Sequence, residues 1–374
     1  MSVASEGDLA PSSRSWLAES PEPLAQRFDV ALLDLDGVVY VGDAAVPGVA
    51  AALDRARRAG MRLAFVTNNA ARPPETVADR LYRLGIAAHA DEVITSAQTA
   101  AHYLAERLPS GAAVLVVGTD GLTEALRERG LRPVFSADDA PQAVVQGYSP
   151  TLTWSALAEG AVAIGRGVLW VATNLDATVP SARGPLPGNG SLVAALRHAT
   201  GVTPVATGKP EPTMHRETVE RTGAQAPLVV GDRLDTDIEG AHAVGCQSLL
   251  VLSGVTTAAR LLTAGPKHRP TFVGWDAGAL LDDHPAPVVD AGRARCGSWH
   301  AQTDAGVGGT GAVLATDRGE SGAAEALDAL RAMAALAWSR GTEETPLAWR
   351  AADDAARSVL AGFGLPPSDS RTNG

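Results

Sequence analysis

Short apolar runs alternate with longer amphipathic stretches along most of the chain. The runs, such as "VALLDLD" and "RLAFVTNN", have the length and composition of buried strands. The stretches between them have helical spacing, and "PPETVADRLYRLG" also has prolines near its start and a glycine after its end, as helices often do. This alternation predicts an α/β fold with a parallel sheet that is covered by helices on both faces.

The rhythm is interrupted by residues 90–198, which have strand candidates of their own in "AVLVVG", "AVVQGY" and "VLWVATN". A segment of this length is too long to be a loop in a compact domain. We therefore expect a core formed by residues 28–89 and 199–285, with a second α/β unit inserted at 90–198. The Gly- and Pro-rich stretch 179–191 is interpreted as an ordered loop that faces the core; a surface linker is the alternative.

Both ends of the chain depart from this pattern. Residues 1–27 are rich in Ser, Pro and acidic groups and lack the features of a signal peptide, so we expect a disordered leader. Residues 286–365 are predicted to form a small α-rich or α+β domain, followed by a flexible tail at 366–374. The small domain has no evident acid–base cluster, which favours a regulatory or interaction role. Its "GVGGTG" at 306–311 lacks the strand–helix context of a dinucleotide-binding loop.

Composition narrows the classes of protein that fit. The chain has 374 residues, 45% of them hydrophobic, which is ample for a sizeable core. Its formal charge of −11 argues against a nucleic-acid or anionic-membrane partner. Two distant cysteines indicate neither a disulfide framework nor a zinc cluster and fit a reducing cytosol. We therefore predict a cytoplasmic protein without a membrane partner, and a homo-oligomer stays possible.

Four polar side chains fall at or just after the carboxyl ends of apolar runs: Asp34, Thr67, Lys209 and Asp232. Ligands of parallel α/β sheets bind at that edge, so we expect these residues to converge. Asp34 and Asp36 are two positions apart in an extended segment and share a face. Such crowded carboxylates are tolerable around a divalent cation, and Mg²⁺ suits oxygen ligands beside a phosphate.

This set of residues suits phosphoryl transfer. A carboxylate can attack phosphorus to give an aspartyl-phosphate, and a second carboxylate can act as general acid and base. The charge on the phosphate oxygens must also be neutralised. Lys209, Thr67 and the amides around Asn68 and Asn69 are candidates for that task.

Four motifs in order carry a family resemblance: "DLDGV", "FVTNN", "GKPEP" and "GDRLDTDI". Over about residues 28–275 the chain resembles haloacid-dehalogenase-superfamily phosphatases of the p-nitrophenylphosphatase-like branch. The resemblance implies a Rossmann-like parallel core, with the insert acting as an α/β cap. It also implies that Asp34 is the nucleophile and Asp36 the acid/base. Thr67 and Lys209 would bind phosphate.

The same resemblance implies a Mg²⁺ site on the Asp34 carboxylate, the Asp36 backbone carbonyl and Asp232. Asp237 would lie next to these ligands without binding the metal itself. The insert would close over the site and exclude water. In the segment that borders the substrate in this branch, Asn174, Asp176 and Arg183 are candidates for reading the leaving group. Either Asp176 or Arg183 could instead be a plain turn or surface residue.

The substrate expected is a small phosphorylated metabolite. Within this branch, the resemblance to chains that have a high Ala and Arg content and an appended C-terminal domain favours glycerol 3-phosphate. The alternatives 2-phosphoglycolate, pyridoxal phosphate, nucleoside monophosphates and p-nitrophenyl phosphate stay open. An alternative of another class is a metal-dependent glycosyltransferase, in which Asp-x-Asp holds a nucleotide-sugar diphosphate. The "GDRLDTD" turn and Lys209 argue against that alternative.

Overall fold

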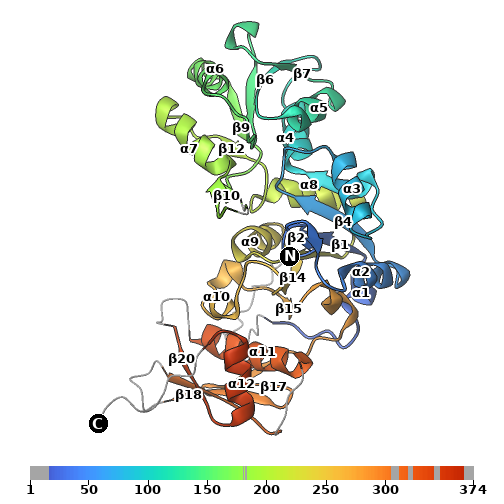
Figure 1. The fold of residues 1–374 in the computed structure, drawn as a ribbon, viewed down its shortest axis with the longest axis vertical. Helices are drawn as coiled ribbons and strands as arrows, with labels where there is room; N and C mark the ends of the chain where they lie inside the picture. The colour runs from blue at the N-terminus through green and yellow to red at the C-terminus, as the bar shows by residue number, and fades with distance from the viewer. Residues whose placement is uncertain are drawn as a thin grey trace, which may run out of the picture.

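Three β-sheet units follow one another along the long axis of the molecule (Figure 1). The computed structural model describes residues 17–179, 181, 183–304, 311–318, 323–340 and 346–365. Three sequence predictions lie wholly or mostly outside these residues: the first 16 positions of the leader, the "GVGGTG" segment apart from Gly311, and the tail from 366.

The central sheet is the predicted core. Its six strands run in the order β15-β14-β13-β1-β4-β5, and every neighbouring pair is parallel. Strand β1 is buried along its whole length, as its unbroken apolar run predicts. Apolar clusters cover both faces of this sheet, so the predicted fold class is confirmed. The strands are β1 (Val30–Leu33), β4 (Arg62–Thr67), β5 (Val93–Thr95), β13 (Pro227–Gly231), β14 (Gln247–Val251) and β15 (Phe272–Gly274).

Helices and short turns connect these strands. The helices are α2 (Val49–Arg58), α3 (Pro74–Arg83), α4 (Ser96–Ala105), α8 (Pro212–Thr222), α9 (Glu239–Ala243) and α10 (Ala258–Leu262). A small hairpin, β2 (Tyr40–Val41) and β3 (Ala44–Ala45), follows β1. Short helical turns of the core lie at η1 (Ala90–Glu92), η3 (Leu234–Ile238), η4 (Pro266–His268) and η5 (Ala277–Leu281), and a further turn, η2 (Ala137–Asp139), lies in the insert.

The insert forms a second parallel sheet, in the order β12-β9-β8-β6-β7. Within the stretch 179–191 the chain forms part of an antiparallel hairpin and then enters a helix. Figure 1 places this hairpin on the side of the insert that faces the core. The elements are β6 (Ala113–Val117), α5 (Asp120–Glu128), β7 (Arg132–Val134), β8 (Ala143–Gln146), α6 (Trp154–Gly165), β9 (Leu169–Ala172), β10 (Thr178–Val179), β11 (Leu186–Pro187), α7 (Asn189–Thr200) and β12 (Val205–Ala206).

The chain passes from the core sheet to the insert sheet, and back again, at positions that differ from the expected limits of the insert, 90 and 198. Strand β5 pairs with β4 of the core, and β12 pairs with β9 of the insert. Both are short apolar runs next to a helix, so their local pattern is the same in either sheet. Only the long-range pairing decides which sheet each one joins.

The C-terminal residues form a third sheet, ordered β16-β17-β18-β19-β20, whose last pair alone is parallel. Of the two predicted alternatives, an α-rich or an α+β domain, the C-terminal unit is therefore α+β. Leu234 and Ile238 of the core join the apolar cluster of this unit, and Trp338 donates its indole N–H to Leu261 O at 3.1 Å. The unit is thus packed beneath the core segment that follows β13. Its elements are β16 (Val288–Asp290), β17 (Arg293–Cys296), β18 (Trp299–Asp304), β19 (Gly311–Thr316), α11 (Ala323–Ser339), β20 (Ala348–Ala351) and α12 (Asp354–Gly362).

The leader prediction is wrong for residues 17–27. Helix α1 (Leu24–Arg27) lies there, Leu17 and Leu24 are buried, and Ser20 pairs with His284. The Ser- and Pro-rich composition of this segment predicted disorder, but Leu24 packs in the apolar cluster of the core and Leu17 packs in that of the C-terminal unit. Among the described residues, no helix has the length and apolar character needed to cross a membrane.

The buried His284 gives the protein a predictable acid sensitivity. Its Nε2–H donates to Ala279 O at 2.9 Å, and its Nδ1 accepts from Arg331 at 3.3 Å. Burial, assisted by Arg331, lowers the pKa of His284 to about 4. As the pH falls below about 6.5 the unfolded histidine takes up a proton first. We therefore expect the free energy of unfolding to fall by about 3 kcal/mol between pH 6.5 and 4 from this group alone.

Urea unfolding at pH 7, 5 and 4 measures this effect. His284→Gln should make the decline with pH shallower than in the wild type, whereas His198→Gln, at an exposed position of α7, should leave it unchanged. Identical pH dependence in the wild type and His284→Gln would show that His284 is not buried in its neutral form.

Candidate active site

The four strand-end side chains lie at the carboxyl edge of the core sheet. Asp34 follows β1 directly, Thr67 ends β4, and Asp232 follows β13. Lys209 reaches them from the turn after β12, with Nζ 2.6 Å from Asp34 Oδ1 and 3.3 Å from Val66 O. The expected convergence is therefore present. Asp34, Thr67 and Asp232 meet because parallel strands of the core end at one edge of the sheet, whereas Lys209 comes from a turn that follows a strand of the insert sheet.

Lys209 is buried between two carboxylates. Its Nζ lies 2.6 Å from Asp34 Oδ1 and 2.7 Å from Asp237 Oδ1. Burial alone would lower the pKa of Lys209, but Asp237 and Asp34 outweigh it and raise that pKa above the usual value. The ammonium group therefore stays charged, in a position where it can neutralise an incoming anion.

Three carboxylates, of Asp34, Asp232 and Asp237, each place one oxygen within 4.8 Å of the others. Both oxygens of Asp237 are engaged, by Lys209 and by the backbone N–H of Arg233. Lys209 contacts Oδ1 of Asp34, and Asp232 Oδ2 accepts from Val255 N at 2.6 Å. Asp232 Oδ1 is buried and has no hydrogen-bond partner among the described residues.

The acidic excess changes the protonation of the cluster. Burial, together with Asp237, raises the pKa of Asp232 to about 7. Burial, with added repulsion from Asp237 and Asp232, also raises the pKa of Asp34 despite the opposing effect of Lys209. A divalent cation would relieve this repulsion and satisfy Asp232 Oδ1. The donor set therefore fits a hard cation held by oxygen ligands.

Two glycines enclose Asp232. A Cβ atom added at Gly37 or at Gly254 would overlap the Asp232 carboxylate, and Gly37 also has a φ of +90°. Gly37 belongs to a motif that the sequence analysis used. Gly254 was missed, because a single glycine after an apolar run gives no sign that a carboxylate 22 positions upstream needs the space.

Asp36 is exposed, and its neighbours were also missed by the sequence analysis. Although the side chain is exposed, the protein packed around it partly desolvates the carboxyl group and raises the pKa of Asp36, and Arg80, Lys209 and Arg72 act in the opposite direction. The guanidinium of Arg80 lies 3.9 Å from the ring centroid of Tyr40, whose hydroxyl acts to lower the pKa of Asp36. A carboxyl group with a raised pKa is suited to donate a proton near neutral pH.

The two asparagines after Thr67 have different environments. The Asn69 backbone N–H donates to Thr67 Oγ1 at 3.1 Å, and its side chain accepts from Ala71 N. The Asn68 side chain is occupied by Lys209 and Asp176. The local sequence gave no sign of this use of the Asn68 side chain, because its partners lie 108 and 141 positions away along the chain.

The three residues expected to border a substrate are placed differently. Asn174 donates to Asn68 O at 2.8 Å, and Asp176 N donates to Asn174 Oδ1, so both lie against the core. Burial raises the pKa of Asp176, opposed by the hydrogen bond from Asn68. Arg183 is exposed in the turn between β10 and β11, where its backbone N–H contacts Ser181 Oγ at 3.1 Å.

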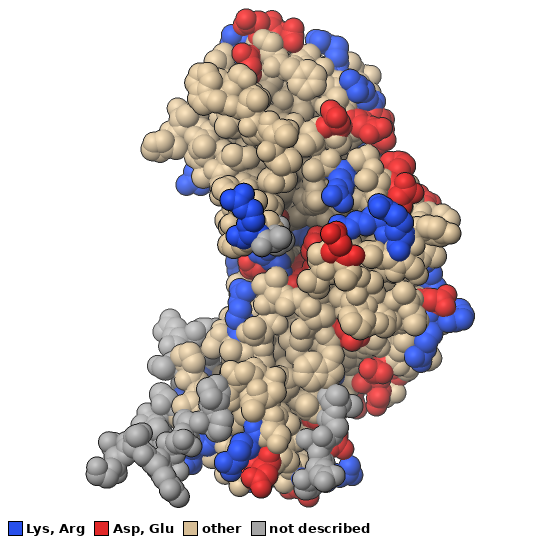
Figure 2. Space-filling model, in the orientation of Figure 1, with Lys and Arg blue, Asp and Glu red and all other residues tan. Residues whose placement is uncertain are grey.

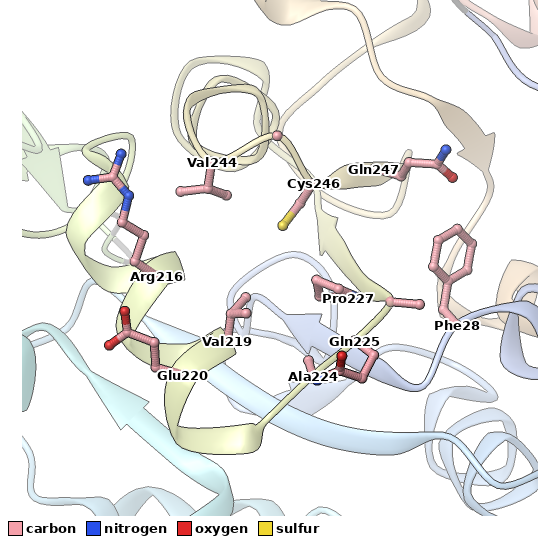
Figure 3. A pocket seen from close by; sticks show the side chains of 12 residues that line it. Phe28, Arg216, Val219, Glu220, Ala224, Gln225, Pro227, Val244, Cys246 and Gln247 are labelled. Carbon is pink, nitrogen blue, oxygen red and sulfur yellow. The ribbon is translucent and has the colours of Figure 1, made fainter.

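The surface is hollowed between the insert and the core, with acidic and basic side chains at the rim (Figure 2). A separate cavity of about 440 Å³ lies elsewhere (Figure 3). It is lined by Pro227 and Gln247, which begin β13 and β14, and by Cys246. It therefore opens at the amino edge of the core sheet, away from Asp34 and Asp232.

Comparisons with known families agree with this geometry. Residues 31–132 match the model of haloacid dehalogenase-like hydrolases, and residues 206–279 match a second HAD-hydrolase-like model. Residues 296–365 match a GCN5-related N-acetyltransferase-like domain.

Individual relatives are similar over long stretches. The chain is 46% identical to D-glycerol 3-phosphate phosphatase of Mycobacterium tuberculosis, over 92% of this chain and 97% of that protein. It is 37% identical to the acid sugar phosphatase of Staphylococcus saprophyticus, over 62% and 89% respectively.

Solved structures are similar too. A glycerol phosphate phosphatase from Mycobacterium tuberculosis in complex with magnesium has a TM-score of 0.81 and 44% identity, covering 92% of this chain and 99% of that one. The p-nitrophenyl phosphatase of Archaeoglobus fulgidus has a TM-score of 0.64 and 30% identity, covering 70% and 99%.

Proposed function

The chain belongs to the haloacid dehalogenase-like hydrolases, and we propose that it hydrolyses glycerol 3-phosphate through an aspartyl-phosphate intermediate. The observation that carries this proposal is the buried Lys209 ammonium, 2.6 Å from Asp34 Oδ1 at the edge of an acidic cluster. A carboxylate beside a fixed cation can receive a phosphoryl group whose charge is already neutralised.

Phosphate binding falls to groups around Asp34. The Lys209 ammonium neutralises the phosphoryl oxygens, and the Thr67 hydroxyl donates a hydrogen bond. The backbone amide of Asn68 completes the cradle, joined by that of Asn69 when it turns from Thr67 Oγ1 to the phosphate. Most catalysis of phosphoryl transfer comes from such positioning and charge neutralisation.

The reaction then proceeds in two displacements. An oxygen of Asp34 attacks phosphorus, the bond between phosphorus and the ester oxygen breaks, and Asp36 gives its proton to the departing alkoxide. Asp36 next takes a proton from a water molecule, whose oxygen attacks phosphorus and releases inorganic phosphate from Asp34. The raised pKa of Asp36 suits the first of these proton transfers.

Asp34 and Asp232 would hold Mg²⁺ with the backbone carbonyl of Asp36. Asp237, whose two oxygens are already engaged, would orient Lys209 and the turn after β13. When bound, Mg²⁺ neutralises charge on the phosphoryl oxygens and on the crowded carboxylates. The buried, unpartnered Asp232 Oδ1 supports this assignment.

The insert, expected at 90–198, acts as a cap that limits water and selects small substrates. Asn174 and Asp176 reach the core and are the better candidates for contacting the leaving group. Arg183 stays a candidate only as an exposed residue at the hairpin turn.

Glycerol 3-phosphate is favoured because D-glycerol 3-phosphate phosphatase of Mycobacterium tuberculosis matches 92% of this chain, a span that includes the C-terminal unit. The other substrates considered are 2-phosphoglycolate, pyridoxal phosphate, nucleoside monophosphates and p-nitrophenyl phosphate. We infer a cytoplasmic location from the free thiols of Cys246 and Cys296.

A turnover screen tests the proposed function. Phosphate release is measured over a panel of phosphorylated metabolites, with and without Mg²⁺, and glycerol 3-phosphate should give the highest kcat/KM. Release should need no nucleotide-sugar, which also separates a phosphatase from a glycosyltransferase. A different best substrate would overturn the substrate proposal, and no phosphate release from any of them would overturn the phosphatase.

A further inference from the structure

Asn68 has an unusual set of hydrogen bonds at the edge of the active site. Its Oδ1 accepts from Lys209 N at 2.8 Å, and its Nδ2 donates to Lys209 O at 3.0 Å. The same Nδ2 donates to Asp176 Oδ2 at 3.1 Å. Its backbone oxygen accepts from Asn174 Nδ2 at 2.8 Å and from Ser96 Oγ at 2.6 Å.

These bonds join three segments that are distant in sequence: the end of β4, the Lys209 turn and the insert loop 174–176. They leave no space between the segments, because a Cβ atom at Gly208 would overlap Thr173 O and lie 2.6 Å from Asn68 Oδ1. One half-buried amide therefore fixes the backbone on both sides of Lys209 and one carboxylate of the insert.

Other contacts hold the insert at a different place. Arg129 at the end of α5 lies 3.5 Å from Glu217 of α8, and Thr119 Oγ1 donates to Ala71 O at 3.3 Å. Neither contact includes Lys209 or Asp176. The Lys209 turn is also tied to the insert sheet, because Thr207 donates to Ala172 O of β9 from its backbone N at 3.1 Å and from its hydroxyl at 3.4 Å. Among the hydrogen bonds of the described residues, those of Asn68 join the loop 174–176 to Lys209 itself.

We propose that Asn68 is a positioning residue that couples the placement of the insert loop to the placement of the Lys209 ammonium. The inference rests on the proposed phosphatase function and deepens it. When the insert loop is seated, Asn68 holds Lys209 against Asp34 and holds Asp176 toward the leaving group. When the loop lifts, the Lys209 turn loses a neighbour that fixes it.

Asn68→Asp breaks this coupling with little change of shape. The substitution keeps an oxygen that accepts from Lys209 N, but it removes both N–H donors and sets a second carboxylate against Asp176. The repulsion should displace the insert loop. Because a misplacement of about 1 Å can reduce turnover by about 100-fold, we expect kcat/KM to fall by about that factor. The loss should appear with both glycerol 3-phosphate and p-nitrophenyl phosphate.

Asp176→Asn supplies the matched partner variant. In the double variant N68D/D176N, the new amide can donate to the new carboxylate, so the bond returns with its direction reversed. Asn68→Asp should therefore cost about 100-fold in the wild-type background and less than about tenfold in the Asp176→Asn background. A merely structural role would give the same cost in both backgrounds. Gln142→Glu, on an exposed residue before β8, controls for the added charge.

Equal costs in the two backgrounds, or no cost at all, would overturn the inference while leaving the phosphatase intact. If the wild type hydrolyses neither substrate with Mg²⁺, the proposed function fails and the inference fails with it. Thermal unfolding checks that each variant is folded. Should Asn68→Asp not fold, Asn68→Ser takes its place: it should lose at least about tenfold in kcat/KM, and unchanged activity would overturn the inference.

Discussion

Asp34→Asn is expected to abolish phosphate release from every substrate, with kcat reduced by at least about 10⁴-fold. An amide oxygen is a poor nucleophile, so the aspartyl-phosphate cannot form. The fold should remain, because asparagine has nearly the same shape and its Oδ1 can still accept from Lys209 Nζ. Replacing this carboxylate also relieves repulsion with Asp232 and Asp237.

Initial rates of phosphate release, alongside circular dichroism and thermal unfolding, measure this effect. Asp54→Asn is the matched control, since Asp54 is an exposed carboxylate on α2 whose partner is Arg58. It should leave kcat unchanged, because an exposed ion pair contributes little. A folded Asp34→Asn protein with more than about a hundredth of the wild-type kcat would exclude Asp34 as the nucleophile.

Loss of the cation is expected to have the next largest effect. Chelation should stop turnover, and Asp232→Asn should lower kcat/KM by about 10³-fold at a fixed Mg²⁺ concentration. That factor corresponds to about 4 kcal/mol, the scale on which a bound metal ion stabilises transition-state charge. The physical reason is that Asp232 Oδ1 is buried beside Asp34 without another partner among the described residues.

Binding can be measured without turnover. Mg²⁺ should raise the thermal midpoint of the wild type, because it binds the folded state, and should do so much less for Asp232→Asn. Asp235→Asn is the control, since this exposed carboxylate pairs with Arg233 outside the cluster. Full activity in the presence of a chelator, or an unchanged Mg²⁺ response in Asp232→Asn, would refute this assignment of the cation site.

Much of the core and the positions of its polar residues could be predicted from local patterns. Apolar runs of strand length predicted β1, β4 and, before Asp232, β13, and the residue after each run is a local feature of the chain. Parallel strands have one polarity, so side chains at their carboxyl ends must meet at one edge. Asp34 and Asp232 were therefore expected together before any distance was known. Lys209 was expected there as well, but for the wrong reason, because β12 belongs to the sheet of the insert.

Predictions failed where burial or strand pairing was inferred from amino-acid composition or from the local hydrophobic pattern alone. Leu17 and Leu24 lie in a Ser- and Pro-rich segment, yet both are buried because the core and the C-terminal unit offer apolar gaps. Strands β5 and β12 were assigned to the wrong sheets, because a run of two or three apolar residues does not encode its partner.

The sequence by itself determined which residue types stand at the strand ends, and thereby the class of chemistry. Only the tertiary structure decided how they are used: that Lys209 bridges Asp34 and Asp237, and that Asn68 binds a turn 141 positions away. The physical reason is that hydrophobic period is a local property of the chain. Hydrogen bonds between distant segments depend instead on how the insert is seated on the core.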